Sequence, residues 1–268
     1  MTRTAPRRAA ASPALALGAA CAALLGCATG ATAPTPGSAT APDRPGPAAL
    51  VAAPDRTDAD RALDGGRHPA ELLAFLDLRP GMRVADLGAG GGYTTELLAR
   101  AVGPTGRVWG QNSKALLGFA GEAWAARLAR PVNAVVIRAD REFDAPLPPD
   151  ATGLDLVVMN ALYHDTVWMK VDRAAMNRAV LAALRPGGAF VVIDSSARAG
   201  DGVEVVQTLH RIDEGLVRAE VEAAGFRLAG TADFLRNPAD TRDWNSSPRA
   251  AAERRGTSDR FVLRFVKP

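Results

Sequence analysis

The stretch VADLGAGGGYTTELLA, residues 84–99, has the residue types and spacing of a ligand-binding loop. One aspartate and three glycines occupy every second position: Asp86, Gly88, Gly90 and Gly92. Glycines leave the backbone N–H groups uncovered, and a helix that begins after such a loop directs unpaired N–H groups at a ligand. The pattern predicts a nucleotide-like ligand held between a short buried strand, 84–87, and a helix over 94–102.

A second group of residues could move a proton. It follows the expected strand 155–159 and consists of polar or ionisable side chains: Asn160, Tyr163, His164 and Asp165. His210, within LHRIDE, is a further candidate that could enter from the far side of a cleft. The chain has three histidines, and an imidazole is the side chain best suited to accept a proton near neutral pH. Hydrogen bonding within a loop remains the alternative for His164, and helix-cap polarity for His210.

Metal binding is a separate question for these residues. His164, Asp165, Asp194 and His210 offer imidazole and carboxylate groups, but their spacing matches no known ligand pattern. The sequence therefore predicts no metal site. Trp168 and Met169 are interpreted as core or lid packing.

The elements that position these residues alternate between strands and helices. We expect strands at 84–87, 107–111, 133–138, 155–159, 189–194, 226–235 and 260–266. We expect helices at 58–78, broken near Gly65-Gly66 and Pro69, and at 94–102, 113–129, 171–184 and 214–224. This order predicts a Rossmann-like α/β fold: a seven-stranded, mostly parallel sheet with helices on both faces and an antiparallel last strand.

The first part of the chain has the composition of an export signal and a linker. In residues 1–26, three arginines precede an Ala/Leu-rich run, and Leu24-Leu25-Gly26-Cys27 resembles a bacterial lipobox. Residues 27–57 are rich in proline and alanine and predict a flexible tether. We therefore expect a lipoprotein-type signal peptide (1–26), a tether (27–57) and one domain (58–268). The chain is expected at the periplasmic face of the cell envelope, touching the membrane only through lipid on Cys27.

The remaining composition limits the partners. The arginines at positions 3, 7 and 8 account for the net charge of +3, so the rest of the chain is balanced. Nucleic-acid-binding surfaces normally show a basic excess, and no nucleic-acid partner is predicted. Both cysteines lie within residues 1–27, so no disulfide is expected in the domain. The sequence carries no signal for an oligomeric state.

The glycine spacing distinguishes two classes of ligand. A dinucleotide site requires G-x-G-x-x-G, but counting from Gly88 places Tyr93, and counting from Gly90 places Thr95, where the third glycine belongs. The D-x-G-x-G-x-G pattern resembles motif I of class I S-adenosylmethionine-dependent methyltransferases. The Pro-Gly-Gly before the fifth strand and two strands near the C-terminus fit the same resemblance, which covers residues 58–268.

A narrower resemblance is carried by short phrases. The chain is similar to a group of exported bacterial methyltransferases in RHPAELLAFL, YHDTVWM, VDRAAMNRAV, LHRIDE, LRNPAD and DRFVLRF. That group implies the fold and the cofactor, and leaves the substrate open. Residues 160–163, NALY, lack both prolines of the N-P-P-Y signature of nucleic-acid amino methyltransferases.

The family resemblance implies roles for the cofactor residues. The glycines would let the backbone approach the amino-acid end of S-adenosylmethionine, with Asp86 near the same end. The family usually has a carboxylate for the ribose hydroxyls where this chain has Gln111-Asn112, and the neutral Asn112 makes weaker bonds. Asp140 matches the residue that meets the adenine amino group, unless it is a solvated loop acid. Asn160 completes the expected cofactor set.

The sequence thus predicts an S-adenosylmethionine-dependent methyltransferase with a small-molecule acceptor. The alternative is a non-catalytic envelope binding protein that kept the fold, motivated by the neutral Asn112 and the export signal. A nucleotide-dependent oxidoreductase is disfavoured by the glycine spacing.

Overall fold

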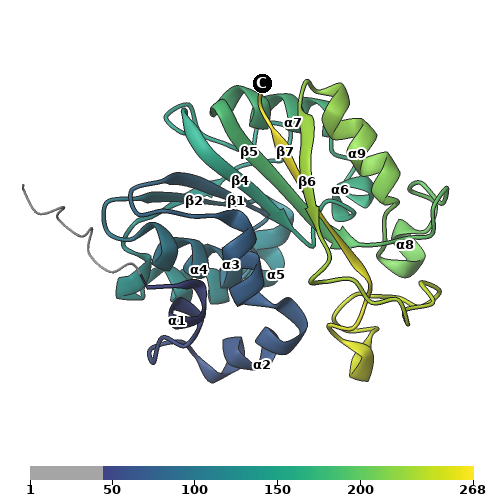
Figure 1. The fold of residues 1–268 in the computed structure, drawn as a ribbon, viewed down its shortest axis with the longest axis horizontal. Coiled ribbons are helices and arrows are strands. Elements are labelled where there is room, and N and C mark those ends of the chain that lie inside the picture. Colours follow the sequence, from purple (N-terminus) through teal and green to yellow (C-terminus); the bar gives the residue numbers. More distant parts are fainter. Residues whose placement is uncertain (1–44) are drawn as a thin grey trace, which may run out of the picture. The chain divides into compact units, whose positions relative to one another are not determined.

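A seven-stranded sheet forms the centre of the computed structural model, which describes residues 45–268 (Figure 1). The order is β3-β2-β1-β4-β5-β7-β6. The strands are β1 (Arg83–Leu87), β2 (Arg107–Asn112), β3 (Val136–Asp140), β4 (Leu154–Asn160), β5 (Leu184–Ser195), β6 (Arg227–Ala232) and β7 (Arg260–Val266). Strand β7 is antiparallel to both of its neighbours, and the other paired strands are parallel. The predicted mostly parallel sheet with an antiparallel last strand is confirmed.

Helices cover both faces of this sheet (Figure 1). They are α1 (Pro47–Val51), α2 (Asp58–Arg67), α3 (Pro69–Leu76), α4 (Tyr93–Val102), α5 (Lys114–Leu128), α6 (Asp165–Trp168), α7 (Arg173–Ala183), α8 (Val206–Leu209) and α9 (Glu214–Ala223). Short 3-10 helices span Pro131–Asn133 and Ala252–Arg254. Ser113 caps α5 by accepting a hydrogen bond from the Leu116 N–H, as its position before the predicted helix indicated.

Strand β5 shows why two helical layers are needed. Its buried side chains alternate between two hydrophobic clusters, because successive residues of a strand point to opposite faces. Val191 and Ile193 pack in the cluster that contains the leucines of α3 and α4. Phe190 and Val192 pack in the cluster that contains Met176 of α7 and the valines of α9. A sheet that is apolar on both faces is stable only when both are covered.

The folded part begins earlier than the sequence indicated. Helix α1 lies inside the stretch predicted as a tether, and its Leu50 and Val51 pack against the α3–α4 cluster. The break between α2 and α3 falls at His68, in the left-handed conformation, directly before Pro69. Gly65 and Gly66 lie within α2, so only the proline part of the predicted break is confirmed.

The predicted signal peptide (1–26), Cys27 and most of the predicted tether lie outside the described residues. Within 45–268, no helix is both long enough and apolar enough to cross a membrane.

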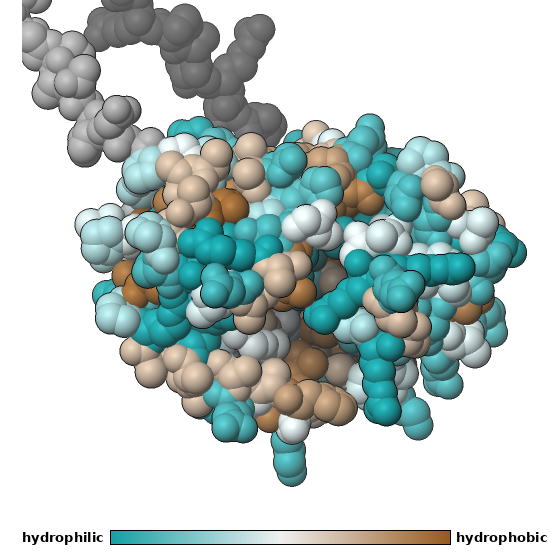
Figure 2. Space-filling view, turned by 90° about the horizontal axis from the view of Figure 1, so that it is seen from below, coloured by the Kyte–Doolittle hydropathy of each residue, from teal (hydrophilic) through white to brown (hydrophobic). Residues whose placement is uncertain are grey.

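The carboxyl ends of the six parallel strands meet at one edge of the sheet, opposite the end of β7 (Figure 1). Figure 2 looks at the molecule from that side and shows a hollow near its middle, with hydrophobic atoms at the bottom. Ligands of open α/β sheets bind at this edge, so both groups of candidate residues are expected there.

Candidate functional site

The glycine loop joins β1 to α4 with backbone conformations that favour glycine. Gly88, Gly90 and Gly92 have φ angles of 71°, 55° and 83°. A Cβ on Gly92 would lie 2.7 Å from the Trp124 ring, and a Cβ on Gly88 would lie 1.8 Å from Cδ2 of Leu162. A Cβ on Gly90 would meet nothing within 4 Å. The loop is therefore packed against the protein at both ends and open at Gly90.

Two side chains at the end of β2 hold this loop. The Gly88 N–H donates to Gln111 Oε1 at 2.9 Å, and the Gly90 N–H donates to Asn112 Oδ1 at 2.8 Å. Asn112 also donates from Nδ2 to the Gly90 carbonyl at 3.1 Å, and Gln111 donates to the Arg141 carbonyl. Both side chains are fully buried. Asn112, which the family resemblance placed at the ribose, therefore pairs with the loop through both ends of its amide.

Asp86 lies beneath the loop, where it is buried and accepts a 2.6 Å hydrogen bond from the Thr95 hydroxyl. Burial raises the pKa of the Asp86 carboxyl to about 7, although the bonds from Thr95 act in the opposite direction. In this conformation Asp86 contacts the start of α4.

The other two predicted cofactor residues end strands β3 and β4. Asp140 is exposed and pairs with Arg138 at 2.8 Å. Asn160 donates to the Thr94 hydroxyl at 3.4 Å, which places it beside the first turn of α4. The structure brings Asn160 and Asn112 to the glycine loop from its two sides, because β1 lies between β2 and β4.

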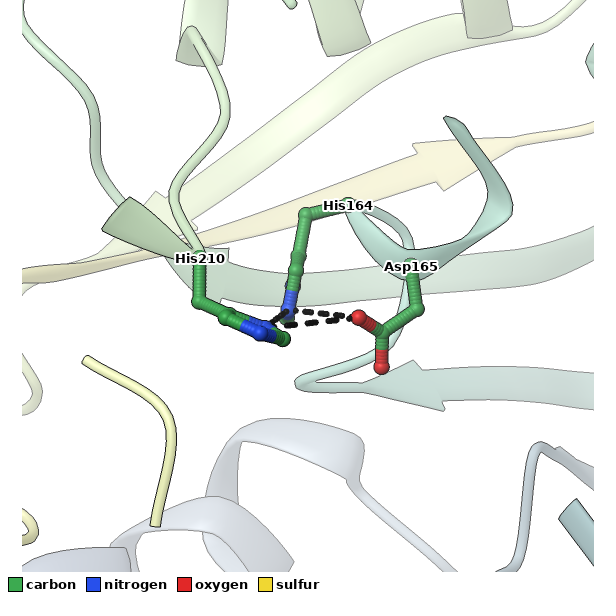
Figure 3. Close-up of side chains that lie close together, drawn as sticks. All are labelled: His164, Asp165 and His210. Carbon is green, nitrogen blue, oxygen red and sulfur yellow. Dashed lines mark hydrogen bonds and ion pairs between the residues drawn. The ribbon is translucent and has the colours of Figure 1, made fainter. Parts of the chain in front are cut away.

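Three of the four predicted catalytic residues converge in a single cluster, drawn in Figure 3. His164 Nε2 lies 3.0 Å from Asp165 Oδ1 and 3.1 Å from His210 Nδ1. His210 Nδ1 lies 3.5 Å from the same Asp165 oxygen. His164 and Asp165 come from the turn after β4, whereas His210 ends α8. We refer to His164, Asp165 and His210 as the imidazole–carboxylate cluster.

Asp194, at the end of β5, orients the cluster from below. Its Oδ1 lies 2.7 Å from His164 Nδ1, and its carboxylate accepts the backbone N–H groups of His164 and Ser195. Burial alone would lower the pKa of His164, but the charges of Asp194 and Asp165 raise it to about 10. His164 in turn holds the pKa of Asp165 below its usual range despite burial. Two carboxylates therefore surround one imidazole and stabilise its protonated form.

The long connection 237–258 positions His210. Ser246 donates from Oγ to the His210 carbonyl at 2.5 Å, and its N–H donates to the Leu209 carbonyl. The same connection carries Asp240, which forms a fully buried ion pair with Arg211, the residue after His210. Connections of this length are uncommon in compact domains and are usually functional or mobile, and this one braces one member of the cluster.

Tyr163, the fourth predicted catalytic residue, lies apart from the cluster. Its side chain is fully buried, donates to Glu220 at 2.9 Å and accepts from Asn177 at 2.9 Å. Burial and the neighbouring Glu220 charge raise the pKa of its hydroxyl above the usual value. These contacts tie the β4–α6 turn to α7 and α9.

Sequence reasoning missed two partly buried arginines near the same edge. The Arg67 guanidinium lies 4.3 Å from the Tyr93 ring centre, and Arg260 donates to the Gly66 carbonyl. Burial lowers the pKa of Arg260 to about 10, and its Nε has no hydrogen-bond partner among the described residues. Each arginine is isolated in the sequence, at the end of α2 and the start of β7, so no local pattern marks the pair.

Comparisons with known proteins agree with this architecture. A family model described as protein-L-isoaspartate(D-aspartate) O-methyltransferase matches residues 53–139, which contain the glycine loop and are less than half of the chain. A solved S-adenosylmethionine-dependent methyltransferase from Aquifex aeolicus shares 18% identity over 80% of this chain and 100% of its own, with a TM-score of 0.53. One from Mesorhizobium loti shares 20% identity over 76% of this chain and 99% of its own, with a TM-score of 0.51.

The solved cyclase SpnF is also similar, with 17% identity over 78% of this chain and 81% of its own and a TM-score of 0.53. A cyclase among the similar structures means that the fold does not by itself name the reaction. The described chain has the Rossmann-like fold of S-adenosylmethionine-dependent methyltransferases.

Proposed function

We propose that this chain is an S-adenosylmethionine-dependent methyltransferase whose acceptor is a small molecule. The observation that carries the proposal is the glycine loop between β1 and α4, with open space at Gly90, at the edge where the imidazole–carboxylate cluster also lies. The matching family model spans this loop. The balanced charge outside the first residues supports a small acceptor over a nucleic acid.

The residues present fit the cofactor at one end of the loop. Gly90 leaves room for a ligand, and Asn112 has a carbonyl oxygen that can accept from a ribose hydroxyl. That oxygen bonds to the Gly90 N–H in this conformation, and Leu162 covers Gly88. Cofactor binding is therefore expected to move Asn112 and Leu162 away from the loop.

The chain's contribution to methyl transfer follows from the position of the cluster. The bound cofactor supplies an activated methyl group, so the protein must align the acceptor, exclude water and, for a protonated nucleophile, accept a proton. His164 and Asp165 follow β4, which is the strand next to β1 and its glycine loop. His210 has the most exposed side chain of the cluster, at 31%, so the acceptor is expected to approach from that side.

Two arginine substitutions test the proposal. Gly90→Arg fills the open space at the loop and is expected to abolish binding of S-adenosylmethionine and its demethylated product. Gly103→Arg is the matched control, because Gly103 also has a positive φ, of 64°, with nothing within 4 Å of its Cβ, and it ends α4. Isothermal titration calorimetry on the full chain, with Cys21 and Cys27 replaced by serine, measures both.

We expect binding by the parent chain and by Gly103→Arg, and none by Gly90→Arg. A folded parent chain that gives no heat with either ligand would overturn the proposal. Equal binding by both variants would place the cofactor elsewhere.

We also propose that the chain is exported and anchored at the periplasmic face through lipid on Cys27. The support is the sequence of residues 1–27: three arginines, an apolar Ala/Leu-rich run and a lipobox-like Leu-Leu-Gly-Cys.

A further inference from the structure

We infer that the imidazole–carboxylate cluster is a binding site for one divalent transition-metal ion of the zinc class. The ligands are His164 Nε2, His210 Nδ1 and Asp165 Oδ1, which all lie within 4.8 Å of one another. This departs from the sequence-based expectation that no metal is bound. The binding of the ion stands independently of methyl transfer, whereas its use in activating an acceptor rests on the proposed function.

The distances between the three atoms fit a shared ion. Zinc bonds to nitrogen and oxygen are about 2.0–2.2 Å long. In a tetrahedral site such bonds place the ligand atoms roughly 3.3–3.5 Å apart, and right-angled bonds place them about 3.0 Å apart. The three separations here are 3.0, 3.1 and 3.5 Å. Figure 3 shows the three side chains turned toward one another.

Hydrogen bonds alone satisfy this triangle poorly. His164 Nε2 carries at most one hydrogen, which it can direct at Asp165 or at His210. A hydrogen on His210 Nδ1 can point to His164 Nε2 at 3.1 Å when that nitrogen carries none, or to Asp165 at 3.5 Å, which is too long for a normal hydrogen bond. Hydrogen bonds can therefore join at most two of the three pairs of ligand atoms. An ion at the centre uses a lone pair from each atom.

The surroundings are those of a built metal site. A metal-bound histidine usually donates its other nitrogen to a carboxylate, which fixes the tautomer. Asp194 has this position, 2.7 Å from His164 Nδ1, and is itself held by two backbone N–H groups. The Asp165 carboxylate accepts a 2.7 Å bond from the Trp168 indole. Both ligands are therefore oriented before an ion arrives.

The site leaves room for another ligand. Two histidines and one carboxylate supply three donors, and sites with three protein ligands keep a position for water or substrate. The side chain of His164 is 9% exposed and that of His210 is 31% exposed, so the cluster opens to solvent on the His210 side. An oxygen atom of a small acceptor could occupy the free position and lose its proton more easily there.

Direct zinc binding tests the inference. The full chain, without a histidine tag and with Cys21 and Cys27 replaced by serine, is stripped with a chelator and titrated with Zn²⁺ by calorimetry. We expect one ion per chain and a rise in the thermal unfolding temperature with Zn²⁺. Co²⁺ in place of Zn²⁺ is expected to give a visible absorption spectrum typical of nitrogen and oxygen ligands.

The chain supplies a closely matched control. His68 and His210 both have left-handed backbone conformations, with φ angles of 47° and 50°, and both end helices. Asparagine tolerates this conformation. His210→Asn is therefore expected to weaken zinc binding at least tenfold, and His68→Asn to leave it unchanged. Asp194→Asn, which alters only the partner of a ligand, is expected to weaken it by about 10- to 100-fold.

Three outcomes would overturn the inference: no saturable binding of Zn²⁺ by the folded parent chain, equal loss in both histidine variants, or undiminished binding by His210→Asn. If His210→Asn does not fold, Asp165→Asn replaces it, since Asp165 lies in a short helix near the surface. The test is separate from the cofactor proposal, because zinc is titrated in the absence of S-adenosylmethionine and Gly90→Arg is expected to retain zinc binding.

Discussion

At the scale of single residues, Asn112 and His164 show how far chemistry can be assigned from a sequence. The family resemblance placed Asn112 at the ribose of the cofactor, and in the structure its side chain contacts the glycine loop. The sequence could not show that both ends of its amide already pair with Gly90, because side-chain orientation depends on tertiary packing. His164 was a candidate by residue type, whereas Asp194, 30 positions away, reaches it only after two strands pair.

The buried carboxyl of Asp86 predicts how the unfolding free energy of the chain depends on pH. The pKa of this carboxyl is about 7 in the folded chain, against an ordinary value of 3.8 for an aspartate. Between about pH 4 and pH 7 the folded chain retains a proton that the unfolded chain has released, so this residue makes folding less stable as pH rises. Asp86→Asn keeps an oxygen for Thr95 and removes the titration. Relative to the parent chain, the variant should gain on the order of 3 kcal/mol in unfolding free energy between pH 4 and pH 8.

Urea denaturation at several pH values measures this difference. Asp150→Asn, at an exposed position in a loop, is the control and should change little. If the curves of unfolding free energy against pH for Asp86→Asn and the parent chain ran parallel, the proposed titration of Asp86 would be wrong.

At the scale of elements, two glycines of the same loop differ in their surroundings: Gly88 is packed against the protein, and Gly90 faces open space. Gly88→Ala and Gly90→Ala share the cost of a left-handed alanine, about 1 kcal/mol. Gly88→Ala also drives a Cβ into Leu162, whereas Gly90→Ala meets no atom. We expect Gly88→Ala to lower the unfolding free energy by about 2–4 kcal/mol and Gly90→Ala by about 1 kcal/mol. Equal losses in urea denaturation would contradict the packing of Leu162 on Gly88.

Elements with a strong local signal were the ones that could be predicted. Strand β7 has the predicted bounds, Arg260–Val266, because its residues apart from two arginines are valine, phenylalanine or leucine and loop residues precede it. Helix α1 was missed, since Pro-Ala-Ala-Leu-Val is short and its stability comes from packing against α3 and α4. The preceding helix, expected to end at Leu184, ends at Ala183, and Arg185-Pro186-Gly187-Gly188, which lay between the expected helix and the expected strand 189–194, forms the first part of β5.

At the scale of the whole molecule, sequence periodicity was sufficient to predict the sheet. It was insufficient to predict which side chains come together in the imidazole–carboxylate cluster. Alternation of strands and helices predicts parallel pairing, and right-handed crossovers leave few possible strand orders. The cluster, by contrast, joins residues 46 positions apart, and His210 depends on a loop that folds back from positions 237–258. Contacts of this kind form only when the chain has folded, so no characteristic residue spacing in the sequence predicts them.

The proposed anchor is tested at the same scale. Lipid on Cys27 would hold the chain in the membrane fraction after cell lysis. Cys27→Ser is therefore expected to move most of the protein to the soluble fraction, whereas Cys21→Ser, as the control, leaves it in the membrane. Immunoblots of both fractions measure the distribution. Retention of Cys27→Ser in the membrane would contradict the anchor.

The bonds from Gln111 and Asn112 to the glycine loop also constrain the kinetics of cofactor binding. A ligand that accepts a hydrogen bond from the Gly90 N–H replaces the bond to Asn112. The net gain in binding free energy from that bond is therefore small. The apparent dissociation constant is the intrinsic one divided by the fraction of chains in which Asn112 has released the loop, so the apparent affinity is lower. At high cofactor concentration the observed binding rate should therefore stop rising and level off at the rate at which the loop opens.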